Sequence, residues 1–177
     1  GDFFQKVSNF RTLKASQAWL TTLKYFDWFE VSVPEGGKPN WFSRPFSGEE
    51  DWPSDGPWWK PATSIKNGGD IKEVWDLSRF NWLLAMAQRA ANGDNAELDR
   101  LNSWLRDWSE KNPPYMGPNW GCGQEASIRV MHLAIAAVIL EQDKSPSPTV
   151  LSFIKAHLAR IASTLSYALS QDNNHGV

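Results

Sequence analysis

The chain has 177 residues, a length typical of about one domain, and its hydrophobic content of 41% is enough to form a core. Its 18 Lys and Arg against 20 Asp and Glu give a net charge of −2, which excludes a broad basic surface for nucleic acid. The single cysteine, Cys122, excludes an internal disulfide, and no apolar stretch approaches the roughly 18 residues of a membrane span. The unusual number is 11 Trp.

The amino-acid composition of the first third of the chain changes at residue 27. Residues 8–26 have apolar side chains near helical spacing, with Ser8 as a possible cap, and predict a first helix. Residues 27–69 are rich in Pro and Gly, which excludes a long helix, but their aromatic content is too high for a disordered segment. We therefore expect a long ordered coil pinned by tryptophans. Those in or just beyond it are Trp28, Trp41, Trp52, Trp58, Trp59 and Trp75.

Helical patterns fill the rest of the chain. Asp70 and Asp94, each followed three residues later by Glu, predict helices that end near Asn92-Gly93 and at Asn112-Pro113-Pro114. Residues 124–141 are apolar on most sides and predict a buried helix, and residues 149–170 predict a last one. We expect the inward residues of that last helix to be Val150, Ile154, Leu158, Ile161, Leu165 and Leu169. No strand pattern competes, so the fold class is all-α, with antiparallel helix pairs in one domain over residues 1–177.

The segment from Gly117 to Arg129 is the first candidate for chemistry. Two glycines bracket a helix start, where backbone N–H groups and the helix dipole favour an anion. It could form a corner that recognises carboxylate or sulfate, with Trp120 stacking on a sugar ring. Equally, it could be a Gly-rich turn with a structural Trp and an ion pair between Glu125 and Arg129, which lie at i,i+4.

The remaining candidates have weaker signals. From the residues alone, the end of the chain, with Asn174 and His175, is more typical of a polar helix end than of a site. We expect His132 to be a hydrogen-bonded core residue and His157 to lie on a boundary face of its helix. No zinc-ligand spacing, esterase elbow or phosphate-binding loop is present, so no metal or cofactor is expected.

Three separated stretches together resemble one family, the heparinase II/III-like polysaccharide lyases. Residues 70–80, DIKEVWDLSRF, resemble its D-x-K-x-x-W-E-L-x-R-F/H signature, with Asp76 where Glu is commoner. Residues 108–129 are similar to its W-x-x-x-N-P…G-x-N-W…E…R block, and residues 173–175 resemble its N-N-H motif. The resemblance covers roughly residues 25–177.

This resemblance implies an incomplete (α/α) toroid, the N-terminal part of a catalytic domain that further helices and a β-sandwich domain normally follow. Such enzymes cleave uronic-acid polysaccharides, heparan sulfate or alginate-like chains, by β-elimination. It implies that Asn174 and His175 are catalytic. It implies cleft contacts for Asn119, Trp120, Glu125 and Arg129, although this block could instead only lock the turn.

Several expectations follow from the resemblance. The family's further proton-transfer Tyr and His have no counterpart in these 177 residues, so we expect this stretch alone to be inactive. The partner is an acidic polysaccharide, with neither nucleic acid nor membrane. Related enzymes are commonly periplasmic or secreted, although residues 1–10 do not have the pattern of a signal peptide. Two alternatives remain: a non-catalytic carbohydrate-binding module, and a glycoside hydrolase, which would need a positioned carboxylate pair.

Overall fold

The fold is all-α. The computed structural model describes residues 1–6, 16, 18, 20, 25–26, 33, 37–48, 51–60 and 69–170, and within these ranges the regular elements are helical, apart from one isolated bridge between Pro57 and Met116. In chain order the helices are α2 (Lys72–Leu77), α3 (Asn81–Ala91), α4 (Asn95–Lys111), the 3₁₀ helix η1 (Pro118–Trp120), α5 (Gly123–Ile139), α6 (Pro148–Ala162) and α7 (Leu165–Ser170).

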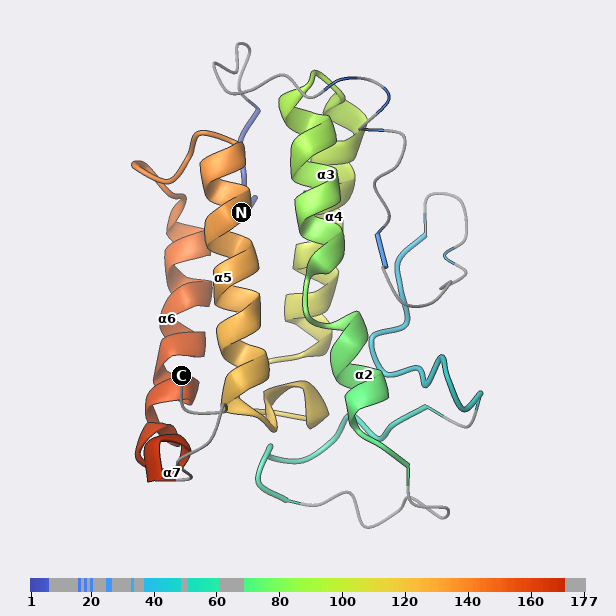
Figure 1. The fold of residues 1–177 in the computed structure, drawn as a ribbon, viewed down its shortest axis with the longest axis vertical. Coiled ribbons are helices and arrows are strands. Elements are labelled where there is room, and N and C mark those ends of the chain that lie inside the picture. Colours follow the sequence, from blue (N-terminus) through green and yellow to red (C-terminus); the bar gives the residue numbers. More distant parts are fainter. Residues whose placement is uncertain are drawn as a thin grey trace.

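The long helices form two antiparallel hairpins, α3 with α4 and α5 with α6 (Figure 1). The hairpins are joined through α3 and α5, which pack against each other and run in the same direction. The α3–α4 turn lies at one end of the bundle, whereas α2, η1 and α7 lie at the other. The expected antiparallel helix pairs are therefore present.

Local chemistry sets most of the helix ends. The Asp94 carboxylate accepts hydrogen bonds from the N–H groups of Ala96 and Glu97, at 3.1 and 3.2 Å, as the sequence predicts for an N-cap. The turn before it contains Gly93, whose φ of 103° suits a residue without a Cβ. At the start of α6, the Ser147 hydroxyl accepts from the N–H of Val150 at 3.2 Å. These caps fix the hairpin turns.

Two predicted helices are each broken once. The helix expected from residue 70 to residue 91 divides into α2 and α3 at Phe80, whose φ of 67° lies in the left-handed region. This conformation is rare for a bulky residue, and here it places the ring in the core against Trp82 and Trp108. The helix expected from residue 149 to residue 170 divides into α6 and α7 at Ser163–Thr164.

Tryptophans fill the core between the coil and the α3–α4 hairpin. The rings of Trp41, Trp82 and Trp104 contact one another with centroids 5.2–6.0 Å apart, in tilted or edge-to-face pairs. Trp41 comes from the coil, is fully buried, and donates its indole N–H to Asp107 of α4 at 2.7 Å. This contact confirms, for the described part of the coil, that a tryptophan pins it to the helices.

The first residues of the chain lie inside the molecule. Phe3 and Phe4 are buried, and their N–H groups both donate to the side-chain oxygen of Asn102 on α4, at 3.0 and 2.9 Å. The Ser147 hydroxyl donates to the carbonyl of Phe3 at 2.8 Å, across 144 residues of chain. This segment therefore joins α4 to the start of α6.

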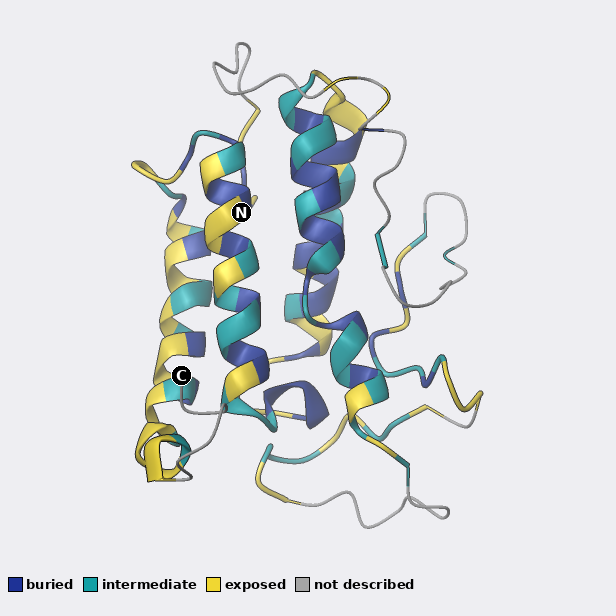
Figure 2. Ribbon diagram, in the orientation of Figure 1, coloured by how far each residue is buried: buried dark blue, intermediate teal, exposed yellow. Residues whose placement is uncertain are grey.

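The outer surfaces of α5 and α6 differ from the prediction. Instead of being buried on most sides, α5 exposes about half of Met131, Ile135 and Val138 (Figure 2). On α6 the fully buried positions include His157 and Arg160, whereas Leu158 is half exposed, and Leu165 and Leu169 of α7 are also exposed. The face of α6 is rotated because its buried polar side chains have partners in the interior: Arg160 donates to the carbonyl of Trp120 in η1, and His157 accepts from Arg129 of α5.

Other predictions concern residues outside the described ranges. Residues 8–26 are described only at positions 16, 18, 20, 25 and 26, and the coil has gaps at 27–32, 34–36, 49–50 and 61–68. Residues 171–177, which include Asn174 and His175, are also outside them. Among the helices that are described, none combines the length and apolar character needed to cross a bilayer.

Candidate functional site

Two of the three stretches that resemble the lyase family meet at one end of the bundle. We call this place the η1 corner and define it by Asp76 and Arg79 at the end of α2, residues 118–122, and Glu125 and Arg129 of α5. The indole N–H of Trp75 donates to the carbonyl of Pro118 at 2.9 Å, and the indole N–H of Trp108 donates to the Ser78 hydroxyl at 2.9 Å. These bonds connect residues 30 and 43 positions apart in the chain.

An ion pair between Arg79 and Glu125 is the strongest connection in the η1 corner. The Nε and Nη2 groups of Arg79 donate to the two carboxylate oxygens of Glu125, each at 2.7 Å, in the planar two-bond geometry that guanidinium and carboxylate favour. Arg79 Nη1 also donates to Asp76. Partial burial raises the pKa of Asp76 above its ordinary value, opposed by Arg79 and reinforced by the Glu125 carboxylate. Glu125 thus pairs with α2 rather than with Arg129 on its own helix.

Arg129 lies fully buried beneath η1. Its Nη2 group donates to the carbonyl of Asn119 at 2.7 Å, and its Nε group donates to Nε2 of His157 at 3.0 Å. Burial lowers the pKa of Arg129 to about 9. Burial and the charge of Arg129 lower the pKa of His157 to about 3, so its ring is neutral, and Nδ1 can donate to the carbonyl of Phe153 while Nε2 accepts.

Arg160 of α6 holds the rest of the turn. Its Nε and Nη2 groups donate to the carbonyls of Trp120 and Gly121 at 2.7 and 2.9 Å, and its Nη1 group donates to the hydroxyls of Ser163 and Thr164. Two arginines from different helices therefore satisfy three successive carbonyls, at residues 119, 120 and 121. The prediction that His157 lies on a boundary face of its helix is wrong, because its ring is fully buried and accepts a hydrogen bond from Arg129. Arg160 was not among the predicted site residues.

The four predicted binding residues of the η1 corner lie in the interior. Asn119, Trp120, Glu125 and Arg129 are each at most 3% exposed, and their hydrogen bonds hold the turn to α2, α5 and α6. The indole of Trp120 donates to the carbonyl of Asn112 at 3.1 Å. This geometry matches the alternative in which the block locks the turn. Contact of these residues with a substrate stays a prediction.

A shallow groove lies beside Trp120. Its volume is about 470 Å³, and its lining comes from the N-terminal segment, the end of α4 and the first half of α6. The lining residues are Phe3, Ser109, Asn112, Pro114, Trp120, Pro148, Thr149, Ser152, Phe153 and Ala156. None of these is charged, so the groove offers no cation to an acidic sugar.

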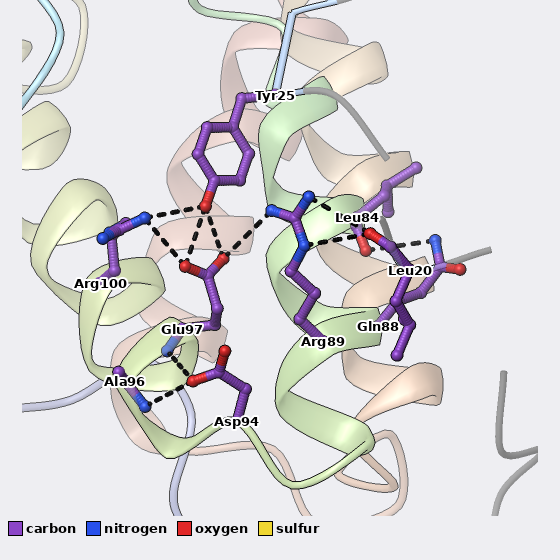
Figure 3. Close-up of polar contacts among 9 residues, drawn as sticks. All are labelled: Leu20, Tyr25, Leu84, Gln88, Arg89, Asp94, Ala96, Glu97 and Arg100. Carbon is purple, nitrogen blue, oxygen red and sulfur yellow. Dashed lines mark hydrogen bonds and ion pairs between the residues drawn. The ribbon is translucent and has the colours of Figure 1, made fainter. Parts of the chain in front are cut away.

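A second polar cluster lies at the opposite end, at the α3–α4 turn (Figure 3). The buried Glu97 carboxylate accepts from the Tyr25 hydroxyl at 2.7 Å and from Arg100 at 2.9 Å, and Arg89 lies 3.5 Å away. Arg89 also reaches the carbonyl of Leu20. Burial, with the Glu97 hydrogen bond, raises the pKa of Tyr25. Because these partners use the hydrogen-bonding capacity of the Glu97 carboxylate, the cluster has a structural role: it connects the N-terminal third of the chain to the α3–α4 hairpin.

Within the described ranges, no group of three or more His, Cys, Asp and Glu side chains is placed to hold a metal ion. Comparisons with known protein families, with curated proteins and with solved structures found no match to this chain. Function must therefore be argued from the residues themselves.

Proposed function

We propose that this chain is the N-terminal part of a polysaccharide lyase that cleaves uronic-acid polysaccharides by β-elimination. The single observation that carries the proposal is the η1 corner, where two stretches chosen for their resemblance to one family are bonded to each other. Arg79 and Glu125, a motif residue from each stretch, pair through two 2.7 Å hydrogen bonds. Residues of two motifs that share one structural role are expected to contact each other, as Arg79 and Glu125 do.

We also propose that the two hairpins belong to an (α/α) toroid. The second hairpin packs on the first through α3 and α5, and the α5–α6 hairpin carries exposed apolar side chains on its outer surface, including Met131, Ile135 and Val138. A third hairpin could cover this surface as α5 covers α3. Contiguous exposed apolar side chains on one helix face are typical of surfaces that another element covers.

The chemistry requires removal of the proton on C5 of a uronate, formation of the C4–C5 double bond and departure of the C4 oxygen with a proton. The sugar carboxylate resists enolate formation unless hydrogen bonds neutralise its charge. We assign Asn174 to the carboxylate, and His175 either to the carboxylate or to the C5 proton. In this proposal the η1 corner keeps the end of the bundle rigid, and α7, the helix that precedes these two residues, begins beside it, with Thr164 against Gly123. Action on a polysaccharide outside the cytoplasm, in the periplasm or after secretion, is part of the same proposal.

The test is direct. Full-length protein is incubated separately with heparan sulfate, alginate and hyaluronan, and the ultraviolet absorbance of the unsaturated uronate end is followed. We expect absorbance to rise with one of these substrates, and we expect the 177-residue chain alone to give little or none. Binding with no absorbance on any uronan would contradict the lyase proposal. New reducing ends without unsaturation would favour a glycoside hydrolase.

A second candidate function is carbohydrate binding without catalysis. The observation that favours it is the exposure of Trp59 in the coil, because a tryptophan side chain is usually at least partly buried. Aromatic side chains on a surface commonly serve as binding contacts. The absorbance assay separates the two functions, because only a lyase forms the unsaturated end.

A further inference from the structure

Trp59 differs from the other tryptophans of the described chain. Its side chain is 66% exposed, whereas Trp41, Trp82, Trp104, Trp108 and Trp120 are buried and Trp52, Trp58 and Trp75 are partly buried. Exposing most of an indole to water has a free-energy cost that is proportional to the apolar area left unburied. With Tyr115 and Met116, which are 37% and 38% exposed on the adjoining loop, Trp59 makes three exposed apolar side chains, far fewer than the roughly 20 residues that each partner contributes to a stable protein interface.

The turn that carries Trp59 is held firmly. The N–H of Trp58 donates to the carbonyl of Tyr115 at 2.9 Å, the N–H of Gly117 donates to the carbonyl of Gly56 at 2.9 Å, and Pro57 forms the bridge to Met116. The N–H of Lys60 closes the turn on the carbonyl of Pro57 at 3.0 Å. These bonds fasten residues 56–60 to the loop that follows α4, at the end of the bundle that contains η1 (Figure 1).

Arg160 connects this turn to the η1 corner. Its guanidinium carbon lies 3.6 Å from the ring centroid of Trp58, in cation–π contact, while its Nε and Nη2 groups bond to the carbonyls of Trp120 and Gly121. The Trp58 ring in turn contacts Trp59 edge-to-face, with centroids 5.8 Å apart. Trp59 is thus an exposed ring on a rigid support, which limits the entropy that a ligand would lose on binding.

The residues next to the ring indicate the class of ligand. An indole face binds the apolar C–H face of a pyranose ring, and Lys60, the next residue, is exposed and offers a cation to a carboxylate. We propose that Trp59 and Lys60 form a surface subsite that binds one uronate ring of an acidic polysaccharide. The choice of uronate rests on the proposed function, whereas the exposed ring and its support do not.

The experiment measures binding to the 177-residue chain by calorimetry and by tryptophan fluorescence. The probes are an alginate hexasaccharide and a heparan sulfate hexasaccharide, with maltohexaose as the neutral comparison. We expect at least one acidic probe to bind more tightly than maltohexaose. Trp59→Ala should weaken that binding at least tenfold, and Lys60→Met should weaken it severalfold, with less effect at high salt. The control is Tyr167→Ala, since Tyr167 on α7 is 67% exposed, and this variant should bind like the parent.

Three results would overturn the inference: no binding of either acidic probe, equal binding of maltohexaose, or an unchanged Kd in Trp59→Ala. Thermal unfolding of each variant checks that the fold is kept, and Trp59→Phe, which retains a smaller ring, should lose less affinity than Trp59→Ala. The outcome is separable from that of the lyase proposal. Binding through Trp59 without any lyase activity contradicts only the proposed function, whereas lyase activity with an unchanged Kd and KM in Trp59→Ala contradicts only this subsite.

Discussion

The buried pair of His157 and Arg129 predicts acid sensitivity in a pH range where carboxylates contribute little. The pKa of His157 is about 3 in the folded chain, against an ordinary value of 6.5 that applies to the unfolded chain. Between these values the unfolded state binds a proton that the folded state does not, so stability falls as the pH falls. The slope approaches 1.36 kcal/mol per pH unit, and lowering the pH from 7 to 5 should reduce the free energy of unfolding by about 2 kcal/mol. Arg129 stays charged throughout this range.

The assay is urea unfolding at pH 7, 6 and 5, for the parent chain and for His157→Gln. Gln keeps an acceptor for the Nε group of Arg129 but does not titrate, so the variant should lose the part of the pH dependence that comes from His157. Loss of the ring contacts with Trp120 and Phe153, at 4.5 and 4.3 Å, should cost about 1–2 kcal/mol at pH 7. His132→Gln, a change at a partly exposed position of α5, serves as the control and should retain the His157 contribution. Equal pH slopes in the parent and His157→Gln would refute the reasoning.

Three further predictions address the η1 corner, the outer surface and the chemistry. In a double-mutant cycle of Arg79→Met and Glu125→Gln, urea unfolding should give a coupling energy of about 1–3 kcal/mol, because the Glu125 side chain is only 4% exposed. A coupling energy near zero would contradict the role given to this ion pair. Ile135→Lys should change the free energy of unfolding of this chain by no more than about 0.5 kcal/mol. In the full-length protein it should cost about 2 kcal/mol or more, measured by calorimetry, because a third hairpin would bury the lysine. Equal effects in both proteins would argue against that hairpin. In the full-length enzyme, Asn174→Ala should lower kcat more than it raises KM, and an unchanged kcat would remove Asn174 from the mechanism.

Helix positions could be predicted from the sequence wherever local chemistry decides them. Asp94 caps its helix through bonds to residues two and three positions away, and Pro113 stops the same helix, so both signals are readable in a short window. The break at Phe80 was not predicted. A bulky residue in the left-handed region is favoured here because its ring enters a core that includes Trp108 and Phe153, which lie far along the chain from it.

The orientation of α6 could not be predicted for a related reason. Apolar spacing placed Leu158 inward, but the buried side contains His157, whose partner is Arg129. It also contains Arg160, which donates to the carbonyls of residues 120 and 121. Hydropathy assigns histidine and arginine to the surface. A buried arginine is favourable here because the carbonyls of residues 120 and 121 would otherwise lack hydrogen-bond donors. Of the candidate site, the Gly-rich turn before α5 could be predicted from the sequence, but the exposure of Trp59 depends on how the coil lies and has no local signal.

The insertion of the first residues between α4 and α6 has a consequence for the order of assembly. During synthesis Phe3 and Phe4 emerge well before their partner on α6, because the Ser147 hydroxyl that donates to the carbonyl of Phe3 lies 144 residues further along the chain. The N–H groups of Phe3 and Phe4 can bond to Asn102 as soon as α4 has formed, whereas the carbonyl of Phe3 gains its partner only when the start of α6 has been synthesised. We expect Phe3 and Phe4 to be buried late, once α4 and the start of α6 have come together, and their apolar side chains to be accessible to chaperones until then.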